Sequence, residues 1–361
     1  MISSEEFRVR LLLNGYRRLL RPMLFKSNNG DPEVIHEQMI RLLGDLPDTV
    51  LDLVSKLIGQ QSNPVRVAGI NFPGRVGVAA GLDKDARAVK AWGRLGFGFA
   101  ELGTITARPQ PGNNKPRLFR LVSSEGIINR MGFNNQGAEA LARRLSGAGI
   151  RRGNNIMGLP LGISIGKNKA TPLDNAIDDY LFALSALADY ADYVAINISS
   201  PNTPGLRNLQ DEKALGELIE ALVDRAKELA PAGPIPLFVK LAPDLSDNQL
   251  AAIVDICEEA GASGIIAANT TVGRENLARN DVWLANQAGG LSGKPLTRIS
   301  IEMVEKITSH TQLPVMGVGG IMTPGDAQAM FDAGAKLVQV YTGFIFNGPA
   351  LVTGINTLTQ P

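Results

Sequence analysis

Short apolar runs alternate with amphipathic segments over most of the chain after Pro64. Each run has the length of a buried strand, and segments such as 174–190, 246–261 and 324–335 carry apolar residues at helical spacing. Eight runs are expected to be strands: 76–81, 98–103, 160–166, 193–199, 236–242, 264–270, 314–320 and 337–343. Alternation of strand and helix builds a parallel sheet, so the pattern predicts an α/β fold, a (β/α)8 TIM barrel.

The first sixty or so residues follow a different pattern. Apolar residues recur at helical spacing over 5–25, 31–43 and 48–58, with arginines interleaved in the first segment. Asp31 is a natural N-cap, and Pro32 suits the first helical position. These helices either pack onto the barrel or meet at an opening where their apolar faces enter a lipid interface. We expect a small N-terminal α-helical domain over 1–62 and a barrel domain over 63–361.

Three connecting segments are expected to have a particular structural or functional role. The segment 65–74 has the pattern of a small hairpin that closes the bottom of the barrel. The connections at about 105–135 and 271–296 are long for a compact domain. Long loops of this kind usually carry function.

Composition narrows the class of protein. The 36 basic and 35 acidic residues leave a net charge of +1, which does not indicate a nucleic-acid partner. The single cysteine, Cys257, excludes an internal disulfide and fits a small core residue, and with only two histidines we expect no metal site. No apolar run has the length of a membrane span. The N-terminus, with Glu5 and Glu6, does not have the pattern of a signal peptide. We therefore expect a cytosolic topology, which still permits contact with a membrane surface.

Polar side chains gather at the predicted carboxyl ends of the strands. The segment YVAINISSPNTPGLR (193–207), for example, passes from a buried strand into a cluster of small polar residues. The set comprises Lys84, Thr104, Ser164, Lys167, Asn197, Ser199, Ser200, Asn202, Lys240, Asn269, Thr270, Tyr341 and Thr342. Barrel enzymes build their active sites on this face, so the pattern indicates an enzyme.

Glycine-rich turns follow the seventh and eighth strands, in GVGGIMTPGD (317–326) and VYTGFIFNG (340–348). Such glycines let backbone N–H groups approach a phosphate, although each could also form an ordinary tight turn. No G-x-G-x-x-G motif suits a nicotinamide cofactor, whereas flavin mononucleotide (FMN) fits across the barrel mouth. Lys240 would then stabilise the reduced flavin. The alternative is a lysine that extends from a strand end into solvent.

Ser200 is the candidate base. A serine hydroxyl is hard to ionise near neutral pH, so it needs desolvation, a nearby cation such as Lys84, and a relay that removes the proton. Thr203 or a water molecule are candidates for the relay. Asn197 and Asn202 are expected to hold polar atoms of the substrate.

Nine motifs resemble those of the class 2, quinone-dependent dihydroorotate dehydrogenases over essentially the whole chain. They are AAGLDKD, ELGTITARPQPGNNKPRLFRL, INRMGFNN, GKNK, AINISSPNTPGLR, VKLAPDLS, GGLSGKPL, GVGGI and VQVYTGFIFNGP. The resemblance implies an enzyme of pyrimidine biosynthesis that oxidises (S)-dihydroorotate to orotate. FMN is then the hydride acceptor, and a membrane quinone reoxidises it.

The resemblance also implies roles for residues at matching positions. Ser200 is the catalytic base that takes the C5 proton, while hydride passes from C6 to N5 of the flavin. The implied substrate contacts are Lys84, Asn129, Arg130, Met131, Gly132, Phe133, Asn197, Asn202, Asn269 and Thr270. The implied flavin contacts are Ala80, Gly81, Thr104, Ser164, Asn197, Lys240, Ala268, Gly293, Gly320, Tyr341 and Thr342.

The quinone would meet His36 and Arg120 by the same resemblance, although His36 by itself is typical of a histidine on a helix face. Class 1 relatives use a cysteine base and lack the N-terminal helices, so Ser200 favours class 2. The helices then form a quinone tunnel at the membrane. The implied protein is a monomer, held peripherally on the cytoplasmic face of the cell membrane.

Two positions depart from the family pattern. Ser164 stands where the family usually has asparagine, and Ala268 stands where it usually has threonine. Each change removes or shortens a hydrogen-bonding group near the flavin, worth about 1 kcal/mol. We expect weaker flavin retention with intact chemistry.

Two other functions remain as alternatives from the sequence. One is a different flavin-dependent barrel that reduces a pyrimidine or an enone. The other is a membrane-surface binding protein built on a barrel that has lost its activity. The presence together of Lys84, Ser200 and Lys240 argues against the second.

Overall fold

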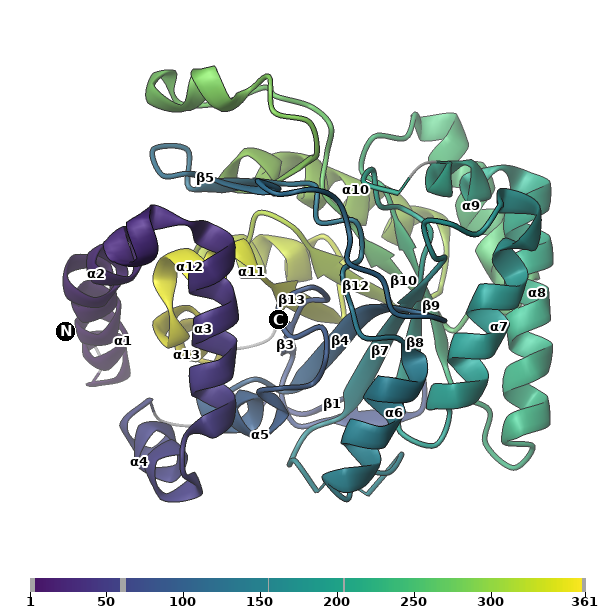
Figure 1. The fold of residues 1–361 in the computed structure, drawn as a ribbon, viewed down its shortest axis with the longest axis horizontal. Helices are drawn as coiled ribbons and strands as arrows, with labels where there is room; N and C mark the ends of the chain where they lie inside the picture. The colour runs from purple at the N-terminus through teal and green to yellow at the C-terminus, as the bar shows by residue number, and fades with distance from the viewer. Residues whose placement is uncertain (1–3, 59–62, 155, 204, 359–361) are drawn as a thin grey trace.

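The fold is an eight-stranded parallel barrel, seen in a computed structural model that describes residues 4–58, 63–154, 156–203 and 205–358 (Figure 1). The closed order is β10-β12-β13-β3-β4-β7-β8-β9. The strands are β3 (Val76–Val78), β4 (Phe99–Thr106), β7 (Leu161–Gly166), β8 (Tyr193–Asn197), β9 (Leu237–Leu241), β10 (Gly264–Ala267), β12 (Val315–Val318) and β13 (Leu337–Val340). The predicted barrel is confirmed. Most strands end earlier than predicted, by one to three residues.

Helices surround the barrel on its outer side (Figure 1). They are α5 (Val89–Trp92), α6 (Ala138–Gly147), α7 (Ala176–Leu187), α8 (Glu212–Leu229), α9 (Asp247–Glu259), α10 (Thr297–His310), α11 (Pro324–Asp332), α12 (Thr342–Asn347) and α13 (Pro349–Asn356). Cys257 lies buried in α9, as expected of a core residue. The hairpin of β1 (Val65–Val67) and β2 (Ile70–Phe72) packs Val67 and Phe72 into the interior of the barrel, as predicted.

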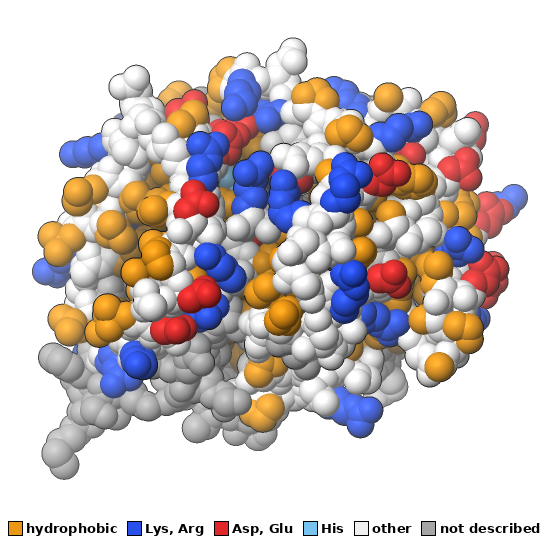
Figure 2. All heavy atoms as spheres, turned by 60° about the horizontal axis from the view of Figure 1, so that its bottom comes forward, with side chains coloured by type: hydrophobic (Ala, Val, Ile, Leu, Met, Phe, Trp, Pro, Cys, Tyr) orange, Lys and Arg blue, Asp and Glu red, His pale blue; other side chains and the backbone are white. Residues whose placement is uncertain are grey.

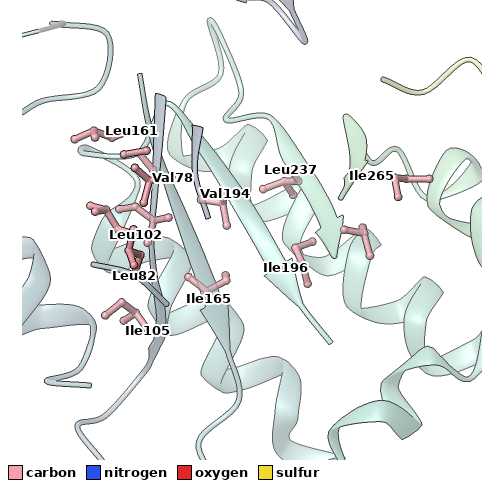
Figure 3. Packing of buried hydrophobic residues seen from close by; sticks show 14 of the residues in the cluster. Val78, Leu82, Leu102, Ile105, Leu161, Ile165, Val194, Ile196, Leu237 and Ile265 are labelled. Carbon is pink, nitrogen blue, oxygen red and sulfur yellow. The ribbon is translucent and has the colours of Figure 1, made fainter. Parts of the chain in front are cut away.

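Alternation along each strand sorts its side chains between two cores. On β8, Val194 and Ile196 point outward to the helices, together with Val78, Leu102 and other side chains of the cluster in Figure 3. Tyr193 and Ala195 point inward, where Tyr193 packs against other aromatic rings at the lower end of the barrel. Burying each large apolar side chain contributes about 1.5–3 kcal/mol. The alternation also aims Asn197 into the barrel mouth.

The three predicted N-terminal helical segments are present (Figure 1): the first packs against α12 and α13, the second against α5 and β5 (Leu118–Leu121), and the third against α13. They comprise α1 (Ser4–Gly15), a π-helical turn (Tyr16–Leu20), α2 (Arg21–Lys26), α3 (Pro32–Asp45) and α4 (Asp48–Ile58). Asp31 caps α3 by accepting hydrogen bonds from the backbone N–H groups of Glu33 and Val34. The boundary expected after residue 62 falls at 59–62, outside the described residues.

The two long connections are not simple loops, which corrects the expectation from the sequence. They contribute β5 (Leu118–Leu121), β6 (Gly126–Asn129) and β11 (Gly290–Gly293), which form a three-stranded sheet over the barrel mouth (Figure 1). All neighbouring strands in it are antiparallel. The strands are only four residues long, and β11 follows β6 by more than 150 residues, so pattern alone could not pair these two.

A buried ion pair ties α3 to this covering segment. The Arg117 guanidinium contacts the Glu33 carboxylate at 2.8 Å, and both residues are buried. Arg117 also donates to the backbone oxygens of Pro111 and Asn113, each at 2.7 Å. Burial opposes ionisation of Glu33, but Arg117 and Lys115 outweigh it and hold the pKa of this carboxyl below its ordinary value.

Glu33→Gln is expected to lower the free energy of unfolding by about 3 kcal/mol at pH 7, because it leaves the buried Arg117 charge without its partner. A carboxyl with a lowered folded-state pKa stabilises the fold above its unfolded pKa and loses that effect as the pH falls through the folded value. The difference between wild type and Glu33→Gln should therefore shrink below pH 4.5, the ordinary pKa. Denaturant unfolding at several pH values measures it.

Asp52→Asn is the matched control, because Asp52 on α4 pairs with Arg94 at 2.8 Å but is largely exposed. Exposed pairs contribute at most about 1 kcal/mol. Equal effects of the two substitutions would contradict the prediction.

Candidate active site

The barrel strands aim a set of polar side chains at one opening. Asn197 ends β8 and is paired in register with Lys240 on the neighbouring β9. On both strands the preceding inward residues are apolar or aromatic, Ala195 and Phe238. The polar layer therefore begins where the apolar interior ends, at the carboxyl edge of the barrel.

These side chains surround a cavity that we call the mouth cavity. Nineteen of its lining residues are predicted site residues: Ala80, Gly81, Lys84, Thr104, Asn129, Met131, Gly132, Phe133, Asn197, Ser200, Asn202, Lys240, Ala268, Asn269, Thr270, Gly293, Gly320, Tyr341 and Thr342. The sequence analysis assigned no role to Ser292 or Gln339, which also line the cavity.

A network of neutral hydrogen bonds holds the amides in place. The Asn197 side chain donates to the Thr104 hydroxyl at 2.8 Å. Asn269 donates to the Asn197 side-chain oxygen at 3.3 Å and to the Ser199 hydroxyl at 2.9 Å. Each amide is thus oriented by its neighbours, so its remaining donors and acceptors are presented to a ligand in a fixed direction.

Lys84 brings a cation to the same cavity. Its ammonium group donates to the Asn134 side-chain oxygen at 2.5 Å. Burial, followed by the nearby Arg117 charge, lowers the pKa of Lys84 to about 8. The side chain is therefore charged at neutral pH but surrenders its proton more readily than an exposed lysine does.

Ser200 lies in the segment after β8 and is 5% exposed. Its hydroxyl oxygen accepts a hydrogen bond from the backbone N–H of Asn202 at 3.3 Å. Thr203, the candidate relay, is also buried, and its hydroxyl has no hydrogen-bond partner among the described residues. A buried hydroxyl without a partner is costly, which favours a ligand or a water molecule beside it.

Lys240 is buried against a carboxylate that the sequence interpretation missed. The Glu101 side chain on β4 is fully buried and lies 3.4 Å from the Lys240 ammonium. Glu101 also accepts hydrogen bonds from Gln339 at 2.7 Å and from the Tyr193 hydroxyl at 3.2 Å. A single charged residue inside the apolar run 98–103 was the available signal. The alternative of a lysine extended into solvent is excluded, because Lys240 is 5% exposed.

Backbone at the ends of β12 and β13 forms a glycine-lined wall. A Cβ atom on Gly320 would lie 2.3 Å from the backbone nitrogen of Thr297, and one on Gly343 would lie 2.0 Å from the oxygen of Ile321. Only glycine fits at either position. Both glycines line the mouth cavity, so backbone forms this part of its wall, as in a phosphate-binding turn.

Three polar residues predicted near the site do not face it. The Arg130 guanidinium points away from the cavity, over the Phe119 ring at 4.7 Å and toward the backbone oxygen of Pro116. Ser164 is fully buried behind Thr104, with the two hydroxyl oxygens 2.9 Å apart. Lys167 donates to the backbone oxygen of its neighbour Asn168. Arg130 and Ser164 can therefore act only through backbone or through another residue.

A second cavity, which we call the helical cavity, lies between the N-terminal helices and α12. Apart from His36, Tyr16 and Arg120, apolar side chains form most of its wall. The Arg120 guanidinium lies 3.8 Å from the centre of the Phe25 ring, a cation–π contact. The His36 ring stacks on Tyr341 at 6.4 Å, and Tyr341 lines the mouth cavity. The two cavities thus meet at one pair of rings.

The barrel combines a polar mouth that bears cations with an adjoining apolar cavity. This combination defines the class of protein: an enzyme that binds a small polar substrate next to an apolar substrate. The family model described as dihydroorotate dehydrogenase matches residues 63–358. A dihydroorotate dehydrogenase (quinone) from Chloroflexus aurantiacus is 49% identical over 352 residues, 94% of this chain and 95% of the relative. One from Salinispora arenicola is 50% identical over 341 residues, 93% and 96% of the two chains.

A solved structure also matches this chain. A crystal structure of DHODH in complex with ferulenol, from Eimeria tenella, superposes with a TM-score of 0.79 at 36% identity, covering 93% of each chain. The chain belongs to the dihydroorotate dehydrogenase family. The resemblance drawn from the nine motifs is confirmed, and with it the class, an oxidoreductase of the quinone-dependent type. The alternative of a non-enzymatic barrel is not supported.

Proposed function

We propose that this chain oxidises (S)-dihydroorotate to orotate in the mouth cavity, with FMN as the hydride acceptor, and passes the electrons to a membrane quinone in the helical cavity. The step belongs to pyrimidine biosynthesis. The observation that carries the proposal is the convergence of Ser200, Lys84, Lys240 and an oriented set of asparagines on one cavity. The adjoining apolar cavity supports the second half of the reaction.

The substrate half uses groups with complementary tasks. Lys84 offers a positive charge for the carboxylate of dihydroorotate, and Asn129, Asn197, Asn202 and Asn269 offer amides for its ring oxygens and nitrogens. Ser200 takes the proton from C5, and Thr203 passes it on. Burial opposes ionisation of the Ser200 hydroxyl, whereas the Lys84 charge favours it.

The residues of the cavity fit FMN. The glycine-lined wall at Gly320 and Gly343 suits its phosphate, and Lys240 supplies a cation within the barrel. Bound FMN would supply the acceptor for the hydride that leaves C6. The contribution of Lys240 is to stabilise the negative charge that arrives with that hydride. Glu101 keeps the ammonium group in place inside the barrel.

On the quinone side, Arg120 and His36 are the proposed contacts to the head group. Burial, followed by the Lys84 charge, lowers the pKa of His36 to about 4. The imidazole is therefore neutral at pH 7, which lets it serve as both hydrogen-bond donor and acceptor. The apolar remainder of the cavity suits an isoprenoid tail.

We propose peripheral membrane contact through the N-terminal helices, residues 1–62, on the cytoplasmic face and as a monomer. Hydrophobic side chains gather over these helices at the left of Figure 2, with charged side chains between them. Among the described residues, the exposed large hydrophobic side chains of these helices are Leu11, Leu19, Leu20, Met23, Leu42, Val50, Leu53 and Leu57. Leucines beside arginines suit a lipid interface. No helix in the described part of the chain is long and apolar enough to cross a membrane.

The test is a visible spectrum of the detergent-purified protein without oxygen. The flavin band should bleach on addition of dihydroorotate and return on addition of a quinone. Arg120→Met should bleach at the wild-type rate but recover about 10- to 100-fold more slowly, since it removes a cation from the quinone cavity only. A flavin that stays oxidised with dihydroorotate would refute the substrate and favour another flavin-dependent barrel.

The Ser164→Asn, Ala268→Thr double variant is expected to release flavin more slowly than wild type, by about 5- to 30-fold. Each substitution restores one hydrogen-bonding group, worth about 1 kcal/mol. Flavin release after dilution, followed by its fluorescence, measures the difference. The single variants separate the two positions, because Ala268 lines the cavity whereas Ser164 contacts Thr104. Equal release from the wild type and the double variant would show that neither position weakens retention.

A further inference from the structure

Arg207 lies outside the mouth cavity yet contacts the segments that form it. It belongs to the 3-10 turn η5 (Leu206–Gln210), which follows β8. Leu206 and Leu209 are buried and anchor this turn on the barrel. The guanidinium therefore projects from a well-supported piece of backbone.

The three guanidinium nitrogens of Arg207 reach three different segments. Nε donates to the backbone oxygen of Ser199 at 3.1 Å, in the segment after β8. Nη2 donates to the backbone oxygen of Thr270 at 3.3 Å, in the segment after β10. Nη1 forms an ion pair with Asp244 at 2.9 Å, in the segment after β9. One planar cation thus joins the ends of three neighbouring strands.

Asp244 extends this connection. Its carboxylate accepts hydrogen bonds from the Thr271 hydroxyl and from the backbone N–H of Val272, the latter at 3.2 Å. The Asp244 side chain is only 20% exposed and that of Arg207 25%, so solvent screens the pair incompletely. The acid therefore fixes both Arg207 and the residues that follow Thr270.

The two carbonyl groups that Arg207 holds adjoin the proposed chemistry. Ser199 directly precedes Ser200, the proposed base, and Thr270 is a proposed substrate contact in the mouth cavity. A single side chain outside the cavity thus connects the segment of the base with part of the substrate site.

We propose that Arg207, braced by Asp244, is a positioning residue that keeps Ser200 in line with the C5 hydrogen of the substrate. The inference rests on the proposed function. In that reaction the C5–H bond breaks and its proton passes to the Ser200 oxygen. The C6 hydrogen leaves as hydride to the flavin, and the C5–C6 bond becomes double. A displaced serine slows the proton transfer, and a displacement of about 1 Å can cost about 10²-fold in rate.

Arg207→Lys is the principal test, because lysine keeps the charge but cannot direct three donors in one plane. We expect flavin reduction by dihydroorotate, in anaerobic rapid mixing, to slow about 10- to 100-fold. The isotope effect with C5-deuterated substrate should rise, and that with C6-deuterated substrate should not. Flavin content, thermal midpoint and reoxidation by quinone should remain those of wild type. Arg298→Lys, an exposed arginine on α10, is the matched control.

Asp244→Asn is a second variant, which tests the proposal if Arg207→Lys does not fold. It removes the ion pair but keeps a side-chain oxygen for Thr271, so we expect a smaller slowing with the same rise in the C5 isotope effect. The double variant should be no slower than Arg207→Lys, because residues that act as one unit are not additive.

Two results would overturn the positioning role. One is an Arg207→Lys enzyme with the wild-type rate and an unchanged C5 isotope effect. The other is a parallel loss of flavin and of both half-reactions, which would mark a general contribution to the fold. A wild-type enzyme that dihydroorotate does not reduce overturns the proposed function itself, and that result is distinct because it needs no variant.

Discussion

Ser200→Ala is expected to slow flavin reduction by dihydroorotate by about 10²- to 10⁴-fold, the range that a positioned general base contributes. Ser200 is buried and lines the mouth cavity, so alanine removes the only proposed proton acceptor at C5 without opening the site to solvent. Flavin should stay bound, because no proposed flavin contact changes. Anaerobic rapid mixing, with the flavin absorbance as signal, measures the rate.

Two further variants test this interpretation of the Ser200→Ala result. Ser309→Ala removes an exposed hydroxyl on α10 that donates to the backbone oxygen of Lys306 in the same helix. This change should leave the rate unchanged. Ser200→Cys should retain part of the rate with a pH dependence shifted to lower pH, since a thiol ionises more readily than a hydroxyl. An unchanged rate in Ser200→Ala would assign the base elsewhere, with Thr203 the first residue to replace.

Lys240→Met is expected to have the second largest effect, and it acts on both stability and chemistry. The substitution leaves the fully buried Glu101 carboxylate without its cation, which costs about 3–5 kcal/mol in the free energy of unfolding. It also removes the positive charge that stabilises the reduced flavin, so reduction should slow about 10²-fold. Denaturant unfolding and anaerobic rapid mixing measure the two effects.

The Lys240→Met, Glu101→Gln double variant separates these effects. It removes both charges, so stability should recover most of the loss, because glutamine still bonds to Gln339 and the Tyr193 hydroxyl. The rate should stay low, and the flavin reduction potential should stay below that of wild type. A double variant that recovered the full rate would show that Lys240 serves the fold alone.

The sequence by itself determined the architecture and most of the candidate site. Alternating apolar and amphipathic segments determine a (β/α)8 barrel, because the strand period of two and the helix period of 3.6 are local properties. Strand ends in such a barrel share one face, so Ser200, Lys240, Asn197, Asn202 and Asn269 had to meet there once the barrel was expected, whereas Asn129 was indicated by the family resemblance alone. The helix N-cap could also be predicted from the sequence, as Asp31 shows at the start of α3.

Only the tertiary structure decided what joins residues far apart in the chain. The pairing of β6 with β11, the Glu33–Arg117 ion pair and the three contacts of Arg207 each connect segments with no common pattern. The direction of a side chain at a predicted site was likewise undetermined, as Arg130 and Ser164 show. The physical reason is that hydrophobic periodicity reports which face of an element is buried, whereas an ion pair or a hydrogen bond depends on which distant atoms the packed elements bring within about 3 Å.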